Sequence, residues 1–309
     1  MPRKPTVAVV GAGVSGLTCG VVLQESGYDV TLFAAEIRNT TSAVAAAIWY
    51  PYHIEPREQA ERWALASYRE FQKLAGQPRT GVSMVWFEVL DSTRRRMPRW
   101  SRSMPRRTLS PDEASPYPFG FAIQVPLIET PLYLPWLRER LRGRIHRRTI
   151  RDLAVLERDF DVVVNCAGIG ARELCDDRRL RPGRGVVLKT PNPGIARHMV
   201  AQEGKTLTYV VSRKRDIILG GTDDCRNDRD VEPALAQAIH ARCTAVDANL
   251  PAQFEIAVGF RPLRNPVRLE RERGTRIIHN YGHGGAGFTV SWGCAREVLR
   301  RLRSFTPSG

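Results

Sequence analysis

The N-terminal part of the chain alternates between short apolar runs and a helical pattern. Residues 7–10 are four consecutive apolar residues, and residues 29–33 form a second segment with the composition of a strand. Between them, apolar residues from Leu17 to Leu23 form a helical run. The pattern therefore predicts a strand, a helix and a second strand in direct succession.

A glycine-rich turn, G-A-G-V-S-G at residues 11–16, joins the first predicted strand to the helix. Gly11 permits a tight turn, Gly13 lets backbone amides approach a pyrophosphate, and Gly16 lets the helix pack close to the strand. The helix N-terminus adds unpaired N–H groups and partial positive charge. The segment thus predicts a dinucleotide-binding βαβ unit, in which Glu36 is the candidate acid for a ribose.

Further helical and strand-like segments follow along the chain. Helical patterns cover residues 58–76, 130–141 and 233–248; strand-like patterns cover 82–90, 121–125, 144–148, 161–168, 184–189, 207–212 and 216–220; residues 111–120 are turn-rich. The run at 161–168 has the character of a buried parallel strand. Because it lies far from the first unit, we expect a nucleotide-binding domain assembled from separated segments. The strands from 184 to 220 are expected to be antiparallel, with a hairpin at 213–215.

Length and composition are those of a globular protein of one or two domains. The 309 residues are 42% hydrophobic and 26% charged. No apolar run approaches the roughly 18 residues that span a membrane. The chain enters its first predicted strand almost at once and ends in Thr-Pro-Ser-Gly, so we expect no signal peptide and no peroxisomal address. The expected location is the cytoplasm, with no membrane partner.

The cysteines and the distribution of charge argue against a zinc protein, a disulfide-rich protein and a nucleic-acid-binding protein. Six cysteines are scattered without a C-x-x-C pair, which argues against a zinc site and a disulfide framework. The formal net charge is +15, mostly from arginines spread along the chain. The densest run, residues 94–107, carries one Trp and no nucleic-acid-binding motif. We therefore expect a solvated basic surface, no metal and no nucleic-acid partner.

Two other segments have the composition of ligand sites. Thr40, Thr41 and Ser42 can donate to a phosphate, and the small residues after them admit a bulky cofactor; they also suit a helix N-cap before an alanine-rich helix. Near the C-terminus, a strand from residue 277, a loop with four glycines and a helix to about residue 303 follow one another. The amides and dipole of this second helix N-terminus can stabilise negative charge on a reduced flavin.

Taken together, these segments resemble the D-amino acid oxidase family, which includes D-aspartate oxidase. The matching motifs are V-x-G-A-G-V-x-G-L at 9–17, T-T-S-x-V-A-A-A-x-W-Y-P-Y at 40–52, V-N-C-A-G at 164–168, P-G-R-G at 182–185, Y-V-V at 209–211, L-G-G-T at 219–222, G-F-R-P at 259–262 and H-N-Y-G-H-G-G-A-G-F-T at 279–289. The first motif is common to many flavoproteins. The last two, combined with the alanine-rich W-Y-P-Y stretch, are specific.

The resemblance implies an α/β fold with two domains. A Rossmann-like FAD-binding domain is expected from residues 1–47, 142–188 and 265–309. A substrate-binding domain with a mixed, largely antiparallel sheet is expected from residues 48–141 and 189–264. The implied cofactor is FAD rather than NAD. The implied reaction is oxidation of a D-amino acid by hydride transfer to flavin N5, with O2 as acceptor, giving a 2-oxo acid, ammonia and hydrogen peroxide.

The resemblance also implies roles for single residues. Arg261 corresponds to the arginine that binds the substrate carboxylate, and a planar guanidinium suits that task. Tyr209 corresponds to a tyrosine that reaches the same carboxylate, Gly285 to a glycine whose carbonyl accepts from the substrate amine, and Tyr50 to a pocket position. The implied FAD contacts are Gly11, Ala12, Gly13, Val14, Ser15, Gly16, Glu36, Thr40, Thr41, Ser42, Ala47, Ile48, Thr149, Ala167, Gly284, Gly285, Gly287, Phe288 and Thr289. His279, Tyr281 and His283 are interpreted as structural.

The chain departs from the family pattern at two places. The segment 199–208 is shorter than the lid of mammalian members, and Lys205 stands about where a second lid tyrosine would be, so we expect a more open site. Asp223 follows Gly-Gly-Thr where D-aspartate oxidases have Arg. An acid there disfavours acidic side chains, so a neutral or basic D-amino acid is expected.

Two alternatives stay open from the sequence. One keeps the fold but changes the substrate, as in an amine oxidase of the glycine or sarcosine type or a biosynthetic oxidase acting on an unusual amino acid. The other is a nucleotide- or nucleic-acid-binding protein without oxidase chemistry. The oligomeric state is open as well, and the sequence is compatible with a homodimer.

Overall fold

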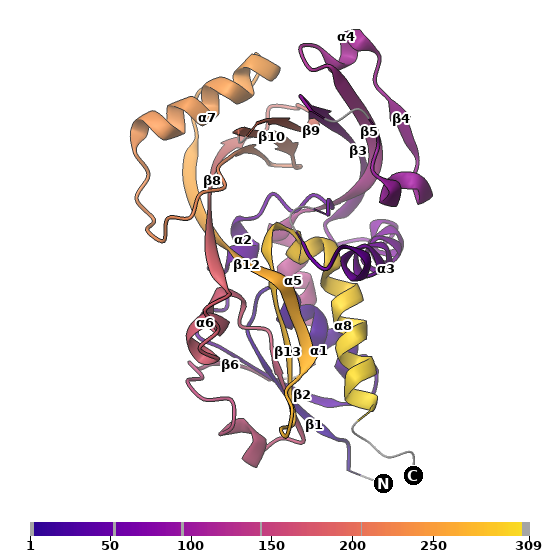
Figure 1. Ribbon diagram of the computed structural model, residues 1–309, viewed down its shortest axis with the longest axis vertical. Helices are drawn as coiled ribbons and strands as arrows, with labels where there is room; N and C mark the ends of the chain where they lie inside the picture. Colours follow the sequence, from indigo (N-terminus) through magenta and orange to yellow (C-terminus); the bar gives the residue numbers. More distant parts are fainter. Residues whose placement is uncertain (1–2, 52–53, 94–95, 143, 205, 305–309) are drawn as a thin grey trace.

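The computed structural model describes residues 3–51, 54–93, 96–142, 144–204 and 206–304. In these residues the strands form one mixed sheet of thirteen strands, in the order β4-β5-β3-β9-β10-β11-β8-β12-β13-β7-β1-β2-β6 (Figure 1). One half of the sheet is parallel and the other half is largely antiparallel. The expected α/β class is thus confirmed.

The parallel half contains the predicted nucleotide-binding unit. Its strands are β1 (Thr6–Val10), β2 (Asp29–Ala34), β6 (Arg144–Arg147), β7 (Val162–Asn165) and β13 (Ile277–His283). Each pairs in parallel with its neighbour in the order β13-β7-β1-β2-β6. Because these strands come from the beginning, middle and end of the chain, the expected assembly from separated segments is confirmed.

The largely antiparallel half lies at the other end of the molecule (Figure 1). Its strands are β3 (Val82–Asp91), β4 (Arg106–Thr108), β5 (Phe119–Ile128), β8 (Arg181–Pro191), β9 (His198–Glu203), β10 (Thr206–Ser212) and β11 (Asp216–Gly220). The hairpin predicted at residues 213–215 joins β10 to β11. Strand β9, which was not predicted, pairs in parallel with β3 and antiparallel with β10.

The long strand β12 (Glu255–Arg271) connects the two halves. Its first part pairs with β8 as far as Leu263, and its last part pairs with β13. Arg261 therefore lies close to the point at which β12 passes from the antiparallel half to the parallel half. This strand places the predicted carboxylate-binding residue between the two parts of the sheet.

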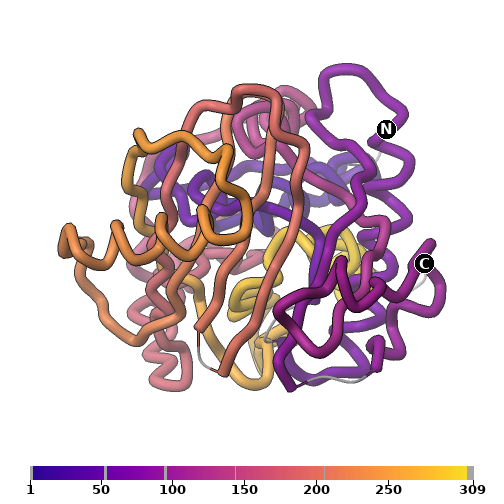
Figure 2. Tube along the Cα trace, turned by 90° about the horizontal axis from the view of Figure 1, so that it is seen from above, coloured from indigo at the N-terminus to yellow at the C-terminus, as the bar shows by residue number. Residues whose placement is uncertain are grey.

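Helices cover the sheet and carry much of the core. They are α1 (Val14–Glu25), α2 (Thr41–Val44), α3 (Arg57–Ala75), α4 (Pro111–Ala114), α5 (Thr130–Arg140), α6 (Ala171–Leu174), α7 (Pro233–Val246) and α8 (Gly287–Arg303), with 3₁₀ turns at Arg99–Ser103, Leu156–Arg158, Gly168–Gly170 and Gly284–Ala286. Helix α8 packs against both α1 and α3. Seen from above, α7 and the β3–β5 segment lie on opposite sides of the molecule (Figure 2).

The alternative interpretation of the alanine-rich segment, a helix after residues 40–42, holds for a single turn only. Helix α2 ends at Val44, and Ala47 adopts a positive φ of 55°. The chain then turns to run beside β5, where Ile128 N donates to Ala47 O at 2.9 Å and Trp49 N donates to Pro126 O at 2.9 Å. Pairing with β5 thus overrides the local helical preference of the alanines.

No helix within the described ranges combines the length and the apolar character that crossing a bilayer requires.

Candidate active site

A cavity of about 970 Å³ runs between the two halves of the sheet. The residues around it come from both glycine-rich segments, from the segment after β2, from the ends of β6 and β7, and from strands β8, β10 and β12. Of the predicted site residues, all except Gly16 and Thr289 line this cavity. The structure therefore brings together residues that are far apart in the sequence.

The first glycine turn is closely packed under the cavity. Gly11 has a φ of 117°, and a Cβ built there would lie 2.2 Å from the Cys166 carbonyl oxygen. A Cβ at Gly16 would lie 1.9 Å from the Gly11 carbonyl oxygen. Gly16 thus lies behind the turn and allows α1 to pack against it, while Gly13, Val14 and Ser15 present the helix N-terminus to the cavity.

The three hydroxyl groups after β2 have different partners. Thr41 Oγ1 donates to the Phe260 carbonyl oxygen at 3.0 Å, and Ser42 Oγ accepts from Val14 N at 3.0 Å. Thr40 Oγ1 is buried without a hydrogen-bond partner among the described residues. Since all three residues line the cavity, Thr40 is the one whose polar atom calls for a ligand there.

Glu36 lies at the cavity with one carboxylate oxygen already engaged. Its Oε1 accepts from the backbone N–H groups of Ile37, Arg38 and Asn39 at 2.8, 2.8 and 3.2 Å. These bonds, that from Arg38 first, lower the pKa of the carboxyl group. Glu36 is therefore a fixed anion whose Oε2 can accept from a ribose hydroxyl.

The second glycine-rich helix start faces the same cavity from β13. Gly284, Gly285, Gly287 and Phe288 line it, at the N-terminus of α8. Thr289 does not line it, since its Oγ1 accepts from Tyr50 N at 3.1 Å and donates to Tyr50 O at 3.0 Å. Thr289 thus ties α8 to the segment that carries Tyr50.

The two histidines of this segment are held in structural contacts. His279 Nε2 lies 2.7 Å from Glu272 Oε2, and burial is the main cause that lowers its pKa. His283 is buried, with Nε2 3.0 Å from Asn280 Oδ1, and burial lowers its pKa to about 4. Although His283 lines the cavity, it stays neutral near pH 7 and its Nε2 is engaged by Asn280.

We predict an acid-sensitive stability from the buried His283 and from the half-buried His198 of β9, because burial lowers the pKa of each to about 4. In the unfolded chain each titrates near pH 6.5, so the unfolded state binds more protons between about pH 4 and 6.5. Above that range the two neutral histidines do not lower the free energy of unfolding. As the pH decreases through the range, the free energy of unfolding falls by up to about 1.4 kcal/mol per pH unit for each histidine. Thermal unfolding of the wild type and of His198→Gln/His283→Gln, measured at several pH values, should show a weaker pH dependence for the variant. An equal pH dependence of the melting temperature in wild type and variant would contradict the assignment of the acid sensitivity to these two histidines.

At the other end of the cavity, Arg261 and Tyr209 lie together. Arg261 Nη1 donates to Thr222 O at 2.9 Å, and the guanidinium lies over Gly185, where a Cβ would come within 2.7 Å of Nη2. The Tyr209 ring lies against Gly220, where a Cβ would come within 2.0 Å of Cζ. Burial raises the pKa of Tyr209 and the Arg261 charge opposes that rise, so the hydroxyl is protonated and can donate.

The wall near these residues is apolar and was not predicted. It consists of Phe87, Val187, Val200, Leu207 and Val211, with Tyr50 and Phe260 beside it. Part of this wall could have been predicted from the alternation of side chains along a strand, because Leu207 and Val211 lie two residues from Tyr209 and share its face of β10. Arg229 also lines the cavity and was missed; its guanidinium lies 5.3 Å from the Phe260 ring.

The two departures from the family pattern have clear positions. The short segment 199–208 forms the β9–β10 hairpin, and Val200 and Leu207 within it line the cavity. Lys205 lies outside the described residues. Asp223 is not among the cavity-lining residues; its Oδ1 lies 3.4 Å from Arg261 Nη1. The acid therefore contacts Arg261, the residue predicted to bind the carboxylate, and not the apolar wall.

Comparison with known proteins defines the class. The family described as "FAD dependent oxidoreductase" matches residues 6–301. D-amino-acid oxidase of Rubrobacter xylanophilus is 41% identical over 304 residues, 94% of this chain and 93% of that protein. D-amino-acid oxidase of Streptomyces coelicolor is 41% identical over 312 residues, 96% and 97% of the two chains. The crystal structure of glycine oxidase from Bacillus cereus has a TM-score of 0.77 at 16% identity, covering 98% of this chain and 96% of its own, a likeness of fold alone.

The chain is therefore an FAD-dependent oxidoreductase. Within that class it belongs to the D-amino acid oxidase family, as its motifs indicated. The cavity fits the cofactor: two helix N-termini face it, Gly11 and Gly16 of the first turn leave no room for a Cβ, and the buried Thr40 hydroxyl has no protein partner in the part of the chain that the structure describes.

Proposed function

We propose that this enzyme oxidises the α-amine of a D-amino acid whose carboxylate binds Arg261 and Tyr209. The observation that carries the proposal is the position of Arg261. Its guanidinium lies at the cavity that the two glycine-rich helix starts also line, and among the described residues the carboxylate paired with it is Asp223, 3.4 Å from Nη1. A bound FAD would supply the acceptor for the hydride of the substrate Cα–H, and O2 would be the final electron acceptor, which gives hydrogen peroxide. The released imino acid hydrolyses to a 2-oxo acid and ammonia.

The protein's own contribution is orientation and electrostatics. Arg261 and Tyr209 fix the carboxylate, and the Gly285 carbonyl accepts a hydrogen bond from the neutral amine, so that the Cα–H is directed at the cofactor. Tyr50 lies at the edge of this pocket, 5.8 Å from the Phe87 ring. The N-terminus of α8 favours negative charge on the reduced cofactor. The neutral, hydrogen-bonded His283 has no role as a base in this scheme.

The apolar wall supports a preference for neutral side chains. An acidic side chain would lose hydration against Phe87, Val200 and Leu207, since none of these side chains offers it a hydrogen-bond donor. Asp223 favours a basic side chain over an acidic one only through its longer-range negative potential, since its contact is with Arg261 and not with the wall. We therefore propose neutral or basic D-amino acids over acidic ones.

The wider assignments are proposals of the same kind. Residues 1–47, 142–188 and 265–309 would hold FAD, and residues 48–141 and 189–264 the substrate. Six free thiols, with Cys225 exposed, favour a reducing compartment, and we propose the cytoplasm. Each residue proposed for the site comes from one chain, so a homodimer would be compatible with activity but not required for it.

A panel of D- and L-amino acids tests the proposal. Purified protein with a flavin absorbance spectrum should release peroxide with D-isomers and not with L-isomers. Substrate added without oxygen should bleach the spectrum. Turnover of glycine and sarcosine alone would replace the proposal by the glycine-oxidase type. A flavin spectrum without turnover of any D-amino acid would overturn it.

A further inference from the structure

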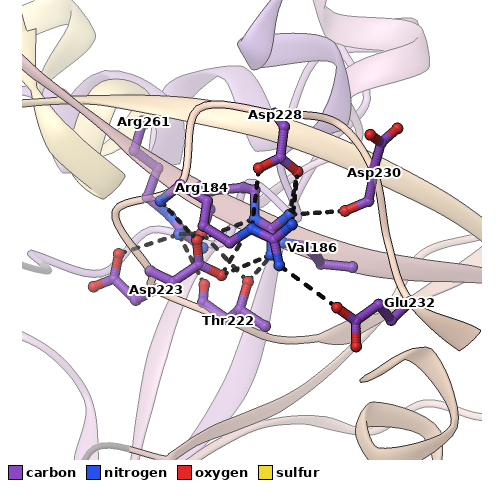
Figure 3. Close-up of polar contacts among 10 residues, drawn as sticks. Arg184, Val186, Thr222, Asp223, Asp228, Asp230, Glu232 and Arg261 are labelled. Carbon is purple, nitrogen blue, oxygen red and sulfur yellow. Dashed lines mark hydrogen bonds and ion pairs between the residues drawn. The ribbon is translucent and has the colours of Figure 1, made fainter. Parts of the chain in front are cut away.

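A buried arginine, Arg184 on β8, lies next to the carboxylate-binding site. Its side chain is 1% exposed, yet it does not line the cavity. Nε and Nη2 donate to the Asp224 carboxylate at 3.0 and 3.1 Å, and Nη1 donates to Asp228 Oδ1 at 3.0 Å and to Asp230 O at 2.8 Å (Figure 3). Every nitrogen of the guanidinium thus binds the segment after β11.

That segment has almost no regular secondary structure of its own. Between β11 and α7, residues 221–232 contain a single bridge, Arg184 to Asp224, in which Arg184 N donates to Asp224 O at 2.7 Å. Thr222 adds two further bonds, since its Oγ1 accepts from Val186 N at 2.9 Å and donates to Arg184 O at 3.3 Å. Arg184 and its main-chain neighbours therefore hold this segment, which we name the 221–232 strap, against β8.

The start of the strap holds Arg261. Arg261 Nη1 donates to Thr222 O at 2.9 Å, lies 3.4 Å from Asp223 Oδ1 and contacts the Arg184 carbonyl oxygen at 3.5 Å (Figure 3). Among the described residues, these carbonyl and carboxylate acceptors all lie on Nη1. The Tyr209 hydroxyl also interacts with the guanidinium. Nε and Nη2, which form the opposite edge, have no carbonyl or carboxylate acceptor in the described part of the chain and suit a bidentate substrate carboxylate.

We propose that Arg184 is a positioning residue for substrate binding. By fixing the strap, it keeps Thr222 and Asp223 on Nη1 of Arg261 and so presents the Nε–Nη2 edge to the substrate carboxylate. This inference rests on the proposed role of Arg261. The motif P-G-R-G at 182–185 then has two functions: Gly185 makes room for the Arg261 guanidinium, and Arg184 fixes its acceptors.

Loss of Arg184 should act on binding more than on chemistry. Asp224 and Asp228 are about one-third exposed, so both can be hydrated once the arginine is gone. The strap then keeps its main-chain bonds to β8 but loses every bond to the guanidinium, so its residues 224–230 are held less firmly. The Arg261 side chain next to it gains rotamers that it must give up when substrate binds. The reacting atoms and the FAD site are not touched by this change.

The matched pair of variants is Arg184→Met and Arg213→Met. Arg213 is also buried, at 4% exposure, and its Nε and Nη2 donate to Asp216 at 2.6 and 2.9 Å. It lies on the β10–β11 hairpin and does not line the cavity. Both variants remove a buried guanidinium that is paired with carboxylates, and both are expected to lower the melting temperature. Only Arg184→Met should change how the Arg261 guanidinium is held.

Binding of benzoate, a carboxylate without an amine, can be followed in the holoenzyme by the change in flavin absorbance. We expect Arg184→Met to raise the benzoate Kd and the KM of D-amino acids about tenfold, with kcat and FAD affinity within about threefold of wild type. Arg213→Met should leave benzoate Kd within about twofold. Unchanged benzoate binding in Arg184→Met, or an equal rise in Arg213→Met, would overturn the inference.

A double-mutant cycle separates the two proposals. In an Arg261→Met background, Arg184→Met should raise the benzoate Kd no further, because it acts through Arg261. If Arg261→Met alone leaves the Kd unchanged, the proposed carboxylate site itself fails. Should Arg184→Met not fold, Asp228→Asn takes its place, since it weakens one attachment of the strap. A Kd rise of about threefold supports the inference and an unchanged Kd refutes it.

Discussion

Alanine at Gly11 is expected to leave the protein with little bound FAD. A Cβ at this position would lie 2.2 Å from the Cys166 carbonyl oxygen and 2.7 Å from its carbonyl carbon, both backbone atoms that cannot turn away. The φ of 117° is also one that L-residues rarely adopt, which costs about 1–3 kcal/mol by itself. We expect FAD affinity to fall about a hundredfold and the melting temperature to drop, measured by flavin absorbance after gel filtration and by thermal unfolding.

Gly170→Ala is the control for this prediction. Gly170 lines the same cavity, but its φ is −62° and the nearest heavy atom to a Cβ there is the Ala167 Cβ at 3.9 Å. We expect near-normal flavin content in this variant. Retention of flavin by Gly11→Ala would mean that the turn can move apart from β7, and the close packing described for it would not be a requirement for the cofactor.

The parts of the fold that were predictable are those fixed by local physics. The strand–turn–helix at the N-terminus follows from apolar runs and from the steric need for glycine at Gly11 and Gly16. The run that became β7 was identified because a strand buried on both faces is continuously apolar. In each case the signal lies within a few residues of the structure that it specifies.

The parts that were missed depend on distant pairing. Strand β9 pairs with β3, more than a hundred residues earlier in the chain, as well as with its hairpin partner β10, and the full length of β12 depends on its two partners β8 and β13. The alanine-rich segment after Val44 has a high local helix propensity, yet it follows β5 instead. Single-sequence patterns carry no information on such partners.

The residues of the candidate site likewise include some that the sequence could identify and some that it could not. Arg261 and Tyr209 were identified through motifs, and Leu207 and Val211 could have been found from strand alternation around Tyr209. The partners of Arg261 could not, because Thr222 and Arg184 are 39 and 77 residues away in the sequence. Asp223 was noticed as a departure from the family, but its contact with the guanidinium depends on how the strap folds onto β8.

Replacement of Arg261 by methionine should have the largest effect on substrate binding. The variant removes the Nε and Nη2 donors, and hydrogen bonds to charged groups contribute about 1.5–3 kcal/mol each. Two such bonds correspond to a rise of about two to four orders of magnitude in the KM of D-amino acids and in the Kd of benzoate. Steady-state peroxide release and flavin absorbance measure the two quantities. Because Arg261 is 16% exposed and its side chain ends in the cavity, the variant is expected to fold and to retain FAD.

Two comparison variants show whether the geometry or the charge of Arg261 is responsible for binding the substrate carboxylate. Arg261→Lys keeps the charge but offers a point donor instead of a planar fork, so we expect an intermediate rise of about tenfold to a hundredfold. Arg229→Gln removes another cation from the cavity wall, one whose Nη1 donates to Val258 O at 3.0 Å, and should change KM by less than about threefold. If Arg229→Gln matches Arg261→Met, the carboxylate responds to the overall positive potential of the cavity. If only the Arg261 variants lose binding, the bidentate edge of that one guanidinium determines where the substrate lies.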